Sequence, residues 1–195
     1  MLFFIIHRNS EIILKTSFDS DRFNYREWKE EDFETYKHWM KDEQIRNRMG
    51  LPNKICNYII RKMHKCIGKT KQTAYHFVVV RKRDNILIGF CDISKHAYFD
   101  VAEVGLLIGE KEDWQKGYGT EIMKFLLNFG FNVMKTNVVE IYTTKKNQAA
   151  INLFKKLGFS HSCILKGYCK IENGFEDIIH MYISVAEWNS KKISQ

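Results

Sequence analysis

The sequence has 195 residues, of which 45% are hydrophobic and 28% are charged. This length and composition suit one globular domain with a sizeable core and exclude a disordered or collagen-like chain. Lys and Arg outnumber Asp and Glu by 31 to 23, and the formal charge of +8 favours anionic partners, although a solvated basic surface gives the same balance.

Local patterns disfavour membrane, disulfide and nucleic-acid functions. The apolar start of the chain lacks the features of a signal peptide, and no apolar run approaches the length of a membrane span, so we expect no membrane partner. Five cysteines without a CxxC pair imply neither a disulfide framework nor a zinc site, which fits reduced thiols in a cytoplasmic protein. The basic residues form only short groups without interleaved aromatics, so nucleic acid is a disfavoured partner.

The first third of the chain contains predicted strands and two predicted helices. Residues 1–22 are interpreted as an N-terminal extension with short strands, and the alternating segment 23–28 predicts a further strand. Apolar residues at helical spacing after Asp32 predict an amphipathic helix. A second helix is predicted from Tyr58 to Ile67.

The middle of the chain changes from strands to a helix. Apolar runs at 75–80 and 86–93 flank a polar turn and predict a hairpin, and a third strand is predicted at 101–108. Apolar residues at helical spacing after Gly119 predict a long helix. The β-branched segment 138–144 predicts a buried strand.

The last third of the chain adds one helix and two strands. Asn147 is a good N-cap for this helix, and Gly158 stands where a C-cap glycine is expected. Two strands are predicted near 163–171 and 178–185, and the polar tail 186–195 is expected to fray. The order of elements indicates a mixed α/β domain around one central sheet.

The turn between the strand at 101–108 and the next helix contains two glycines, Gly117 and Gly119. Glycines let the backbone approach a ligand closely, and the first amides of a helix have no intrahelical partners, so a pyrophosphate suits this position. The dinucleotide fingerprint needs a third glycine where Ile122 stands, and the P-loop pattern is absent. Taken alone, the two glycines favour an ordinary strand-to-helix turn.

The neighbouring motifs resemble the GNAT superfamily of N-acetyltransferases, specifically its ribosomal-protein N-acetyltransferase-like branch. That superfamily has Gln/Arg-x-x-Gly-x-Gly/Ala between its fourth strand and third helix, matched here by Gln115 to Thr120 with Trp114 before it. The branch has an acidic residue and a glycine entering the fourth strand, matched by Glu103-Val104-Gly105, and an asparagine before a helix that ends in Leu-Gly-Phe, matched by Asn147 to Phe159. The resemblance covers most of 23–185, which we interpret as the catalytic domain.

The resemblance implies an α/β fold with a mixed, mostly antiparallel central sheet, flanking helices, and fourth and fifth strands that splay apart. In the family acetyl-CoA lies in this gap, its pantetheine arm against the fourth strand and its pyrophosphate on the glycine-bearing turn. Acetyl-CoA is then the co-substrate and no metal is needed. The cofactor-binding residues implied are Leu107, Ile108, Gln115, Lys116, Gly117, Tyr118, Gly119, Thr120, Asn147, Asn152 and Phe154. Asn147 could equally be a plain N-cap.

Acetyl transfer needs a proton acceptor for the attacking amine and can use a proton donor for the leaving thiolate. Glu103 is the candidate base, and a salt bridge at the strand edge is the alternative for it. Many members have a tyrosine in the helix before Leu-Gly-Phe, where this sequence has Phe154, which cannot donate a proton. Tyr142 or Tyr182 could donate the proton instead, or the thiolate leaves unassisted. His180 could act as base or acid, or it could be structural.

The amine acceptor is the least determined part of the reaction. In this family the segment 33–67 shapes the acceptor site, and here it contains Tyr36, Trp39, Arg46, Arg48, Tyr58 and Arg61. As acceptor-site residues, these side chains favour an anionic small-molecule amine, such as a nucleotide-linked amino sugar, or a protein N-terminal amine over a polycation such as spermidine. The alternative is that they are core aromatics and solvated basic residues. A non-catalytic acyl-CoA-binding module and a ribosome- or RNA-associated protein are the rival functions. We expect a monomer or homodimer.

Overall fold

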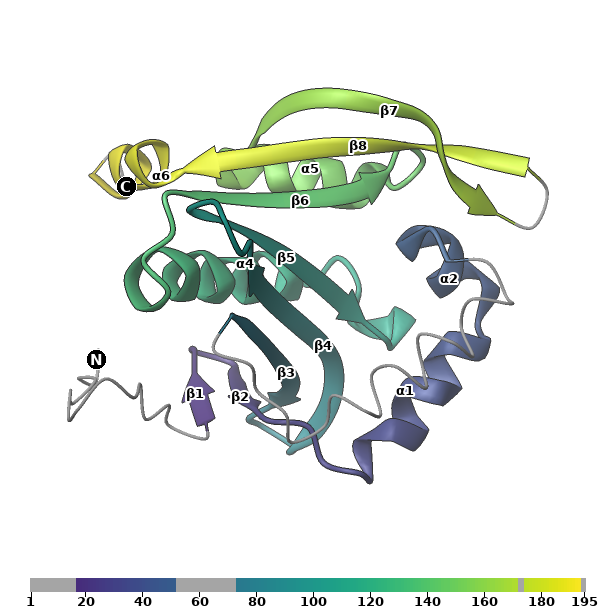
Figure 1. The fold of residues 1–195 in the computed structure, drawn as a ribbon. Helices are drawn as coiled ribbons and strands as arrows, with labels where there is room; N and C mark the ends of the chain where they lie inside the picture. Colours follow the sequence, from purple (N-terminus) through teal and green to yellow (C-terminus); the bar gives the residue numbers. More distant parts are fainter. Residues whose placement is uncertain (1–16, 52–72, 172–173, 194–195) are drawn as a thin grey trace.

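The computed structural model describes residues 17–51, 73–171 and 174–193 (Figure 1). In these residues eight strands form one sheet in the order β1-β2-β3-β4-β5-β6-β8-β7. The strands are β1 (Ser17–Asp19), β2 (Phe23–Arg26), β3 (Ala74–Arg81), β4 (Ile86–Lys95), β5 (Val101–Ile108), β6 (Val138–Thr144), β7 (Ser160–Ile171) and β8 (Gly174–Ser184). The helices are α1 (Asp32–Lys41), α2 (Glu43–Met49), α4 (Tyr118–Asn128), α5 (Gln148–Leu157) and α6 (Val185–Ile193), with a 3₁₀ turn η1 (Lys111–Asp113) and a π turn η2 (Phe129–Val133).

The sheet is antiparallel except between β5 and β6, which run parallel. These two strands pair only where Val101–Glu103 meets Val138–Glu140. Beyond that point β5 continues with β4, and β6 continues with β8. Figure 1 shows the two strands diverging toward α2. The predicted fold, a mostly antiparallel α/β sheet with a fork between these strands, is therefore confirmed.

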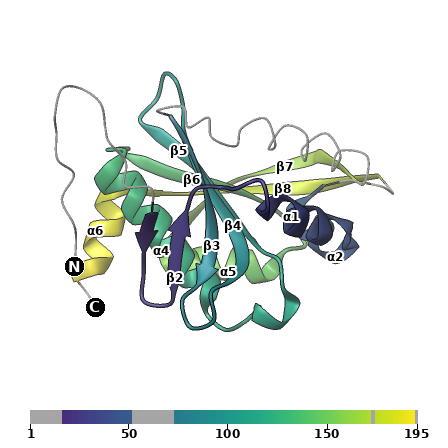
Figure 2. The same ribbon diagram turned by 90° about the horizontal axis from the view of Figure 1, so that it is seen from below.

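Side chains from the two faces of the sheet enter two separate cores. Along β3, Val79 packs into the core beneath α4 and α5, whereas Val78 and Val80 point to the opposite face. This alternation follows from the two-residue period of a strand. The core on the opposite face includes Phe33 of α1 and Leu107 of β5. Figure 2 shows α4 and α5 along one face of the sheet, with α1 and α2 together beside it. None of the described helices is long and apolar enough to cross a membrane.

Most predicted elements are present, with three differences. The helix α2 was not predicted, because it has only seven residues and its ends depend on local caps. Asp42 accepts hydrogen bonds from two amides at the start of α2, and Gly50 ends the helix with a φ of 68°. The tail does not fray over the described residues, since they form α6 and its Trp188 is buried. The sheet also begins before residue 23, because β1 pairs with β2. The helix predicted from Tyr58 to Ile67, and residues 1–16 of the extension, lie outside the described residues.

Candidate functional site

A cavity of about 1190 Å³ occupies the fork between β5 and β6. It is lined by residues from both strands, from the glycine-bearing turn, from α5 and from α2. The predicted site residues that line it are Glu103, Leu107, Ile108, Gln115, Gly117, Tyr118, Gly119, Thr120, Asn147, Asn152 and Phe154. Lys116 is not among the lining residues, and its ammonium group lies 3.3 Å from Asp113 Oδ1. Segments far apart in the sequence thus meet at one site.

The glycine-bearing turn presents free backbone amides to this cavity. Gly117 is the N-cap of α4 with a φ of 76°, and Gln115 also has a positive φ of 62°. The amide of Glu121 donates to Gly117 O, so the three amides of residues 118–120 have no acceptor within the helix. These amides, at the positive end of the α4 dipole, can bind an anion.

Gly119 allows α4 to lie close to its neighbours. A Cβ atom at this position would lie 3.1 Å from Leu153 Cδ2 and 3.6 Å from Leu106 Cδ2. The first turn of α4 therefore packs against both α5 and β5. A side chain here would displace these residues from the cavity wall.

Arg22 holds the turn from outside and was missed by sequence analysis. Its guanidinium donates to Lys116 O (3.1 Å) and Gly117 O (3.2 Å), and it also pairs with Glu121 of α4. Burial raises the pKa of Glu121, but hydrogen bonds from Ser20 and Arg22 outweigh burial and leave that pKa below its ordinary value. No sequence motif marks Arg22, which lies almost a hundred residues before the turn that it anchors.

The segment between β5 and the turn is fixed by one partly buried and one buried hydrogen bond. Trp114 Nε1 donates to Ile108 O at 2.9 Å, so this carbonyl already has a donor. Arg81 Nη1 donates to Asp113 Oδ1 at 2.6 Å. The Trp114 ring is also stacked by the guanidinium of Arg48, 3.7 Å from the ring centroid.

Asn147 caps α5 and connects it to α2. Its Oδ1 accepts from the Ala150 amide at 3.3 Å, and its Nδ2 donates to Arg48 O at 3.2 Å. The capping interpretation is therefore correct, and the same side chain lines the cavity. Phe154 is 3% exposed and packs against Phe159, so its ring forms part of the wall.

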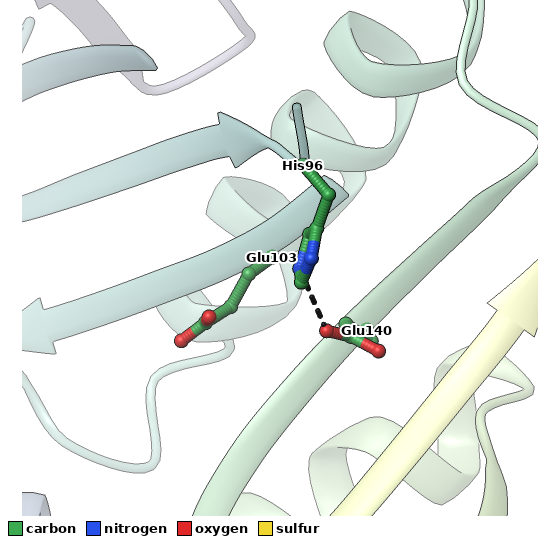
Figure 3. A group of neighbouring side chains, drawn as sticks. All are labelled: His96, Glu103 and Glu140. Atoms are coloured by element: carbon green, nitrogen blue, oxygen red, sulfur yellow. Dashed lines mark ion pairs between the residues drawn. The ribbon is translucent and has the colours of Figure 1, made fainter. Parts of the chain in front are cut away.

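Glu103 lies where the fork opens, beside Glu140 and His96 (Figure 3). Glu140 is nearly buried, and its two oxygens lie 3.0 Å from His96 Nε2 and 3.0 Å from His180 Nε2. The Glu103 side chain is exposed to the cavity, yet desolvation by the surrounding strands raises its pKa. The charges of Asp92 and Glu140 raise this pKa further, against an opposing effect of the two histidines. This group can thus accept a proton at the edge of the cavity.

The structure separates the three candidates for a proton donor. Tyr142 is on β6 and lines the cavity, whereas Tyr182 and His180 are not among the described lining residues. Burial raises the pKa of the Tyr142 hydroxyl, and so do the carboxylates of Glu140 and Glu103. His180 stacks on Tyr142, with ring centroids 4.7 Å apart, while its Nε2 faces Glu140. Its observed contacts are therefore with Tyr142 and Glu140.

The aromatic and basic residues expected at the acceptor site have mostly structural roles. Tyr36 and Trp39 are 2% exposed and belong to the core beneath α1. Arg46 is buried and donates to Met40 O and Lys41 O. Arg48 does line the cavity. The remaining two, Tyr58 and Arg61, lie outside the described residues. Of the residues expected there, only Arg48 thus supports an anionic acceptor; the cavity is also lined by Lys156 and Lys170 and by the acidic residues Asp92, Glu103 and Asp113.

Comparisons with known proteins indicate one family and one fold. The family described as Acetyltransferase (GNAT) domain matches residues 22–160. An uncharacterized N-acetyltransferase named p20 from Bacillus licheniformis is 23% identical over 162 residues, which cover 82% of this chain and 90% of that protein.

Solved structures share the fold at low sequence identity. A spermidine N-acetyltransferase from Vibrio cholerae, in complex with CoA and spermine, matches with a TM-score of 0.75 at 17% identity, covering 87% of this chain and 99% of the other. An acetyltransferase of the GNAT family from Bacillus anthracis matches with a TM-score of 0.71 at 19% identity, covering 86% of this chain and 98% of the other.

Proposed function

Because this chain belongs to the GNAT acetyltransferase family and is an acetyl-CoA-dependent N-acetyltransferase, we propose that it acetylates a primary amine that is held beside Glu103. The position of Glu103 is the observation on which this proposal rests. Its carboxylate lines the cavity at the point where β5 and β6 part. A reacting amine and a thioester in the fork would meet there.

The proposed cofactor site follows the cavity wall. The amides of residues 118–120 hold the pyrophosphate of acetyl-CoA, and Gly117 and Gly119 let the phosphates approach. The pantetheine arm lies between β5 and α5, beside Leu107, Ile108 and the other lining residues named above. Lys116 contributes through its backbone, since its side chain is paired with Asp113.

The reaction proceeds by direct attack on the thioester. The amine transfers its proton to Glu103, and its nitrogen lone pair forms a bond to the thioester carbonyl carbon. The tetrahedral intermediate collapses as the carbon–sulfur bond breaks. The sulfur leaves with the bonding electrons, and Tyr142 protonates it to give free CoA.

The acceptor is a primary amine without an adjoining anionic group. Among the acidic side chains that line the cavity, Asp113 is paired with Arg81, and burial raises the pKa of Asp92. The cations Arg48, Lys156 and Lys170 also line the cavity, but Glu103 would repel a negative charge directly beside the amine. Of the two acceptors predicted from the sequence, a protein N-terminal amine therefore fits better than a nucleotide-linked amino sugar. Placement in the ribosomal-protein N-acetyltransferase-like branch rests on Trp114 and on Glu103-Val104-Gly105. A cytoplasmic location and a monomer or homodimer stay predictions.

Release of the CoA thiol from acetyl-CoA, measured with a panel of amines, tests the proposal. The panel contains a peptide with a free N-terminus, spermidine and a nucleotide-linked amino sugar. The variant Glu103→Gln keeps the shape of the side chain but cannot accept the proton. It should lower kcat by about 10²- to 10⁴-fold without changing acetyl-CoA affinity.

Glu34→Gln is the matched control, since Glu34 is an exposed carboxylate on α1 that pairs with Lys37. It should behave as the unaltered protein. An unchanged kcat in Glu103→Gln would remove Glu103 as the base. Preferred turnover of the amino sugar would contradict the proposed acceptor class.

A further inference from the structure

Three side chains with metal-ligating atoms lie near one another where the fork opens, and they are His96, Glu103 and Glu140. The His96 ring points at Glu140, and the Glu103 carboxylate lies to one side of them (Figure 3). Each offers one ligand atom, and these atoms all lie within 4.8 Å of one another. Bond lengths of ~2.0–2.2 Å from Zn²⁺ to nitrogen and oxygen place neighbouring ligand atoms ~3–3.5 Å apart, so side-chain shifts of about 1 Å would complete a site.

The sheet fixes the backbone positions of all three residues. Glu103 and Glu140 are register partners in the parallel pairing of β5 with β6. His96 directly follows β4, and its amide donates to Val101 O at 2.9 Å, which closes the turn to β5. Glu140 also interacts with His180 Nε2 at 3.0 Å. Such an outer contact orients a ligating carboxylate in known metal sites.

The charge of this group is unusual for such a basic protein. Among the described residues, no Lys or Arg forms an ion pair with Glu103 or Glu140. The nearby side chains that can carry a positive charge are His96 and His180, which contact Glu140. Two carboxylates thus lie together without a permanent positive charge, although the chain has a formal charge of +8. A divalent cation would neutralise both.

We infer that His96, Glu103 and Glu140 form an inhibitory Zn²⁺ site. One imidazole nitrogen and two carboxylate oxygens suit Zn²⁺, and three protein ligands leave a fourth position for water. Acetyl transfer itself needs no metal. The inhibition rests on the proposed function, because a Glu103 carboxylate that is bound to Zn²⁺ cannot accept the proton of the amine.

Titration of the protein with Zn²⁺ against a chromophoric chelator tests the site, and CoA-thiol release in the same buffers tests inhibition. Zn²⁺ should bind the unaltered protein and inhibit transfer in parallel, while Mg²⁺, which prefers six oxygen ligands, should do neither. His96→Asn should weaken both Zn²⁺ effects by more than about 100-fold, with inhibition measured against the metal-free rate of the same variant, since loss even of an outer partner costs ~10- to 100-fold.

His161→Asn is the matched control, because His161 is an exposed histidine on β7, which β8 separates from Glu140 on β6. It should bind Zn²⁺ as the unaltered protein does. Equal Zn²⁺ binding by His96→Asn and His161→Asn would overturn the site. Binding that depends on His96 but leaves transfer uninhibited would overturn the inhibitory role and would also count against Glu103 as the base, while leaving acetyl-CoA binding untouched.

Discussion

Substitution of Gly117 by glutamate tests the proposed pyrophosphate site most directly. Gly117 has a φ of 76°, and a Cβ atom there would have Arg22 Nη2, 3.8 Å away, as its nearest neighbour. An added Cβ atom therefore meets no clash, but a side chain adds left-handed strain of about 1–2 kcal/mol to the folded state. Gly117→Glu and Gly117→Gln share this strain and differ in charge.

The charge difference should decide acetyl-CoA binding. A carboxylate ~6 Å from one phosphate charge costs about 3 kcal/mol at an effective dielectric constant of 20. That energy corresponds to a roughly 100-fold loss of affinity. Arg22 would offset little of this, because Glu121 already pairs with its guanidinium.

Thermal unfolding with and without acetyl-CoA measures the effect. At a ligand concentration of 100 times Kd, binding stabilises the folded state by about 2.7 kcal/mol, which raises the Tm of a domain of this size by roughly 5–10 °C. Gly117→Glu should show almost no shift at the same concentration, and Gly117→Gln should keep most of it. Without ligand the two variants should melt at similar temperatures.

Two results would refute this reasoning. A full Tm shift in Gly117→Glu would mean that the phosphates bind elsewhere. Equal loss of the shift in both variants would mean that the filled space, and not the charge, prevents binding.

Two further predictions concern the proton donor and the anchor of the turn. Tyr142→Phe should lower kcat by about 10- to 100-fold with a thioester donor, and far less with an acetyl donor whose leaving group needs no proton. Equal rates for variant and parent with acetyl-CoA would exclude Tyr142 as the proton donor. Glu121→Gln should lower the free energy of unfolding by about 1 kcal/mol at pH 7, since Arg22 is partly exposed. The folded pKa of Glu121 lies below its ordinary value of 4.5. The stability difference between parent and variant should therefore be complete above pH 4.5 and vanish as the pH falls through the folded pKa. Chemical denaturation at several pH values measures this difference, and a difference that persists at low pH would contradict the pairing of Glu121 with Arg22.

The sequence alone determined the local elements of this protein. Strands such as β5 follow from two-residue apolar alternation, and α5 follows from its cap at Asn147 and its end at Gly158. The glycine-bearing turn was recognisable for the same reason, since positive φ angles and free amides depend on neighbouring residues. Resemblance to a family was still needed to turn a phosphate-friendly turn into an acetyl-CoA site.

Only the tertiary structure decided which distant residues share the site. Arg22 reaches the turn from β1–β2, and His96 and Glu140 join Glu103 from different strands. It also distinguished Tyr142 from Tyr182, and it assigned Arg46 to a structural role. The physical reason is that these contacts depend on sheet order and on the fork between β5 and β6, which arise from long-range pairing and are not encoded in the spacing of neighbouring residues.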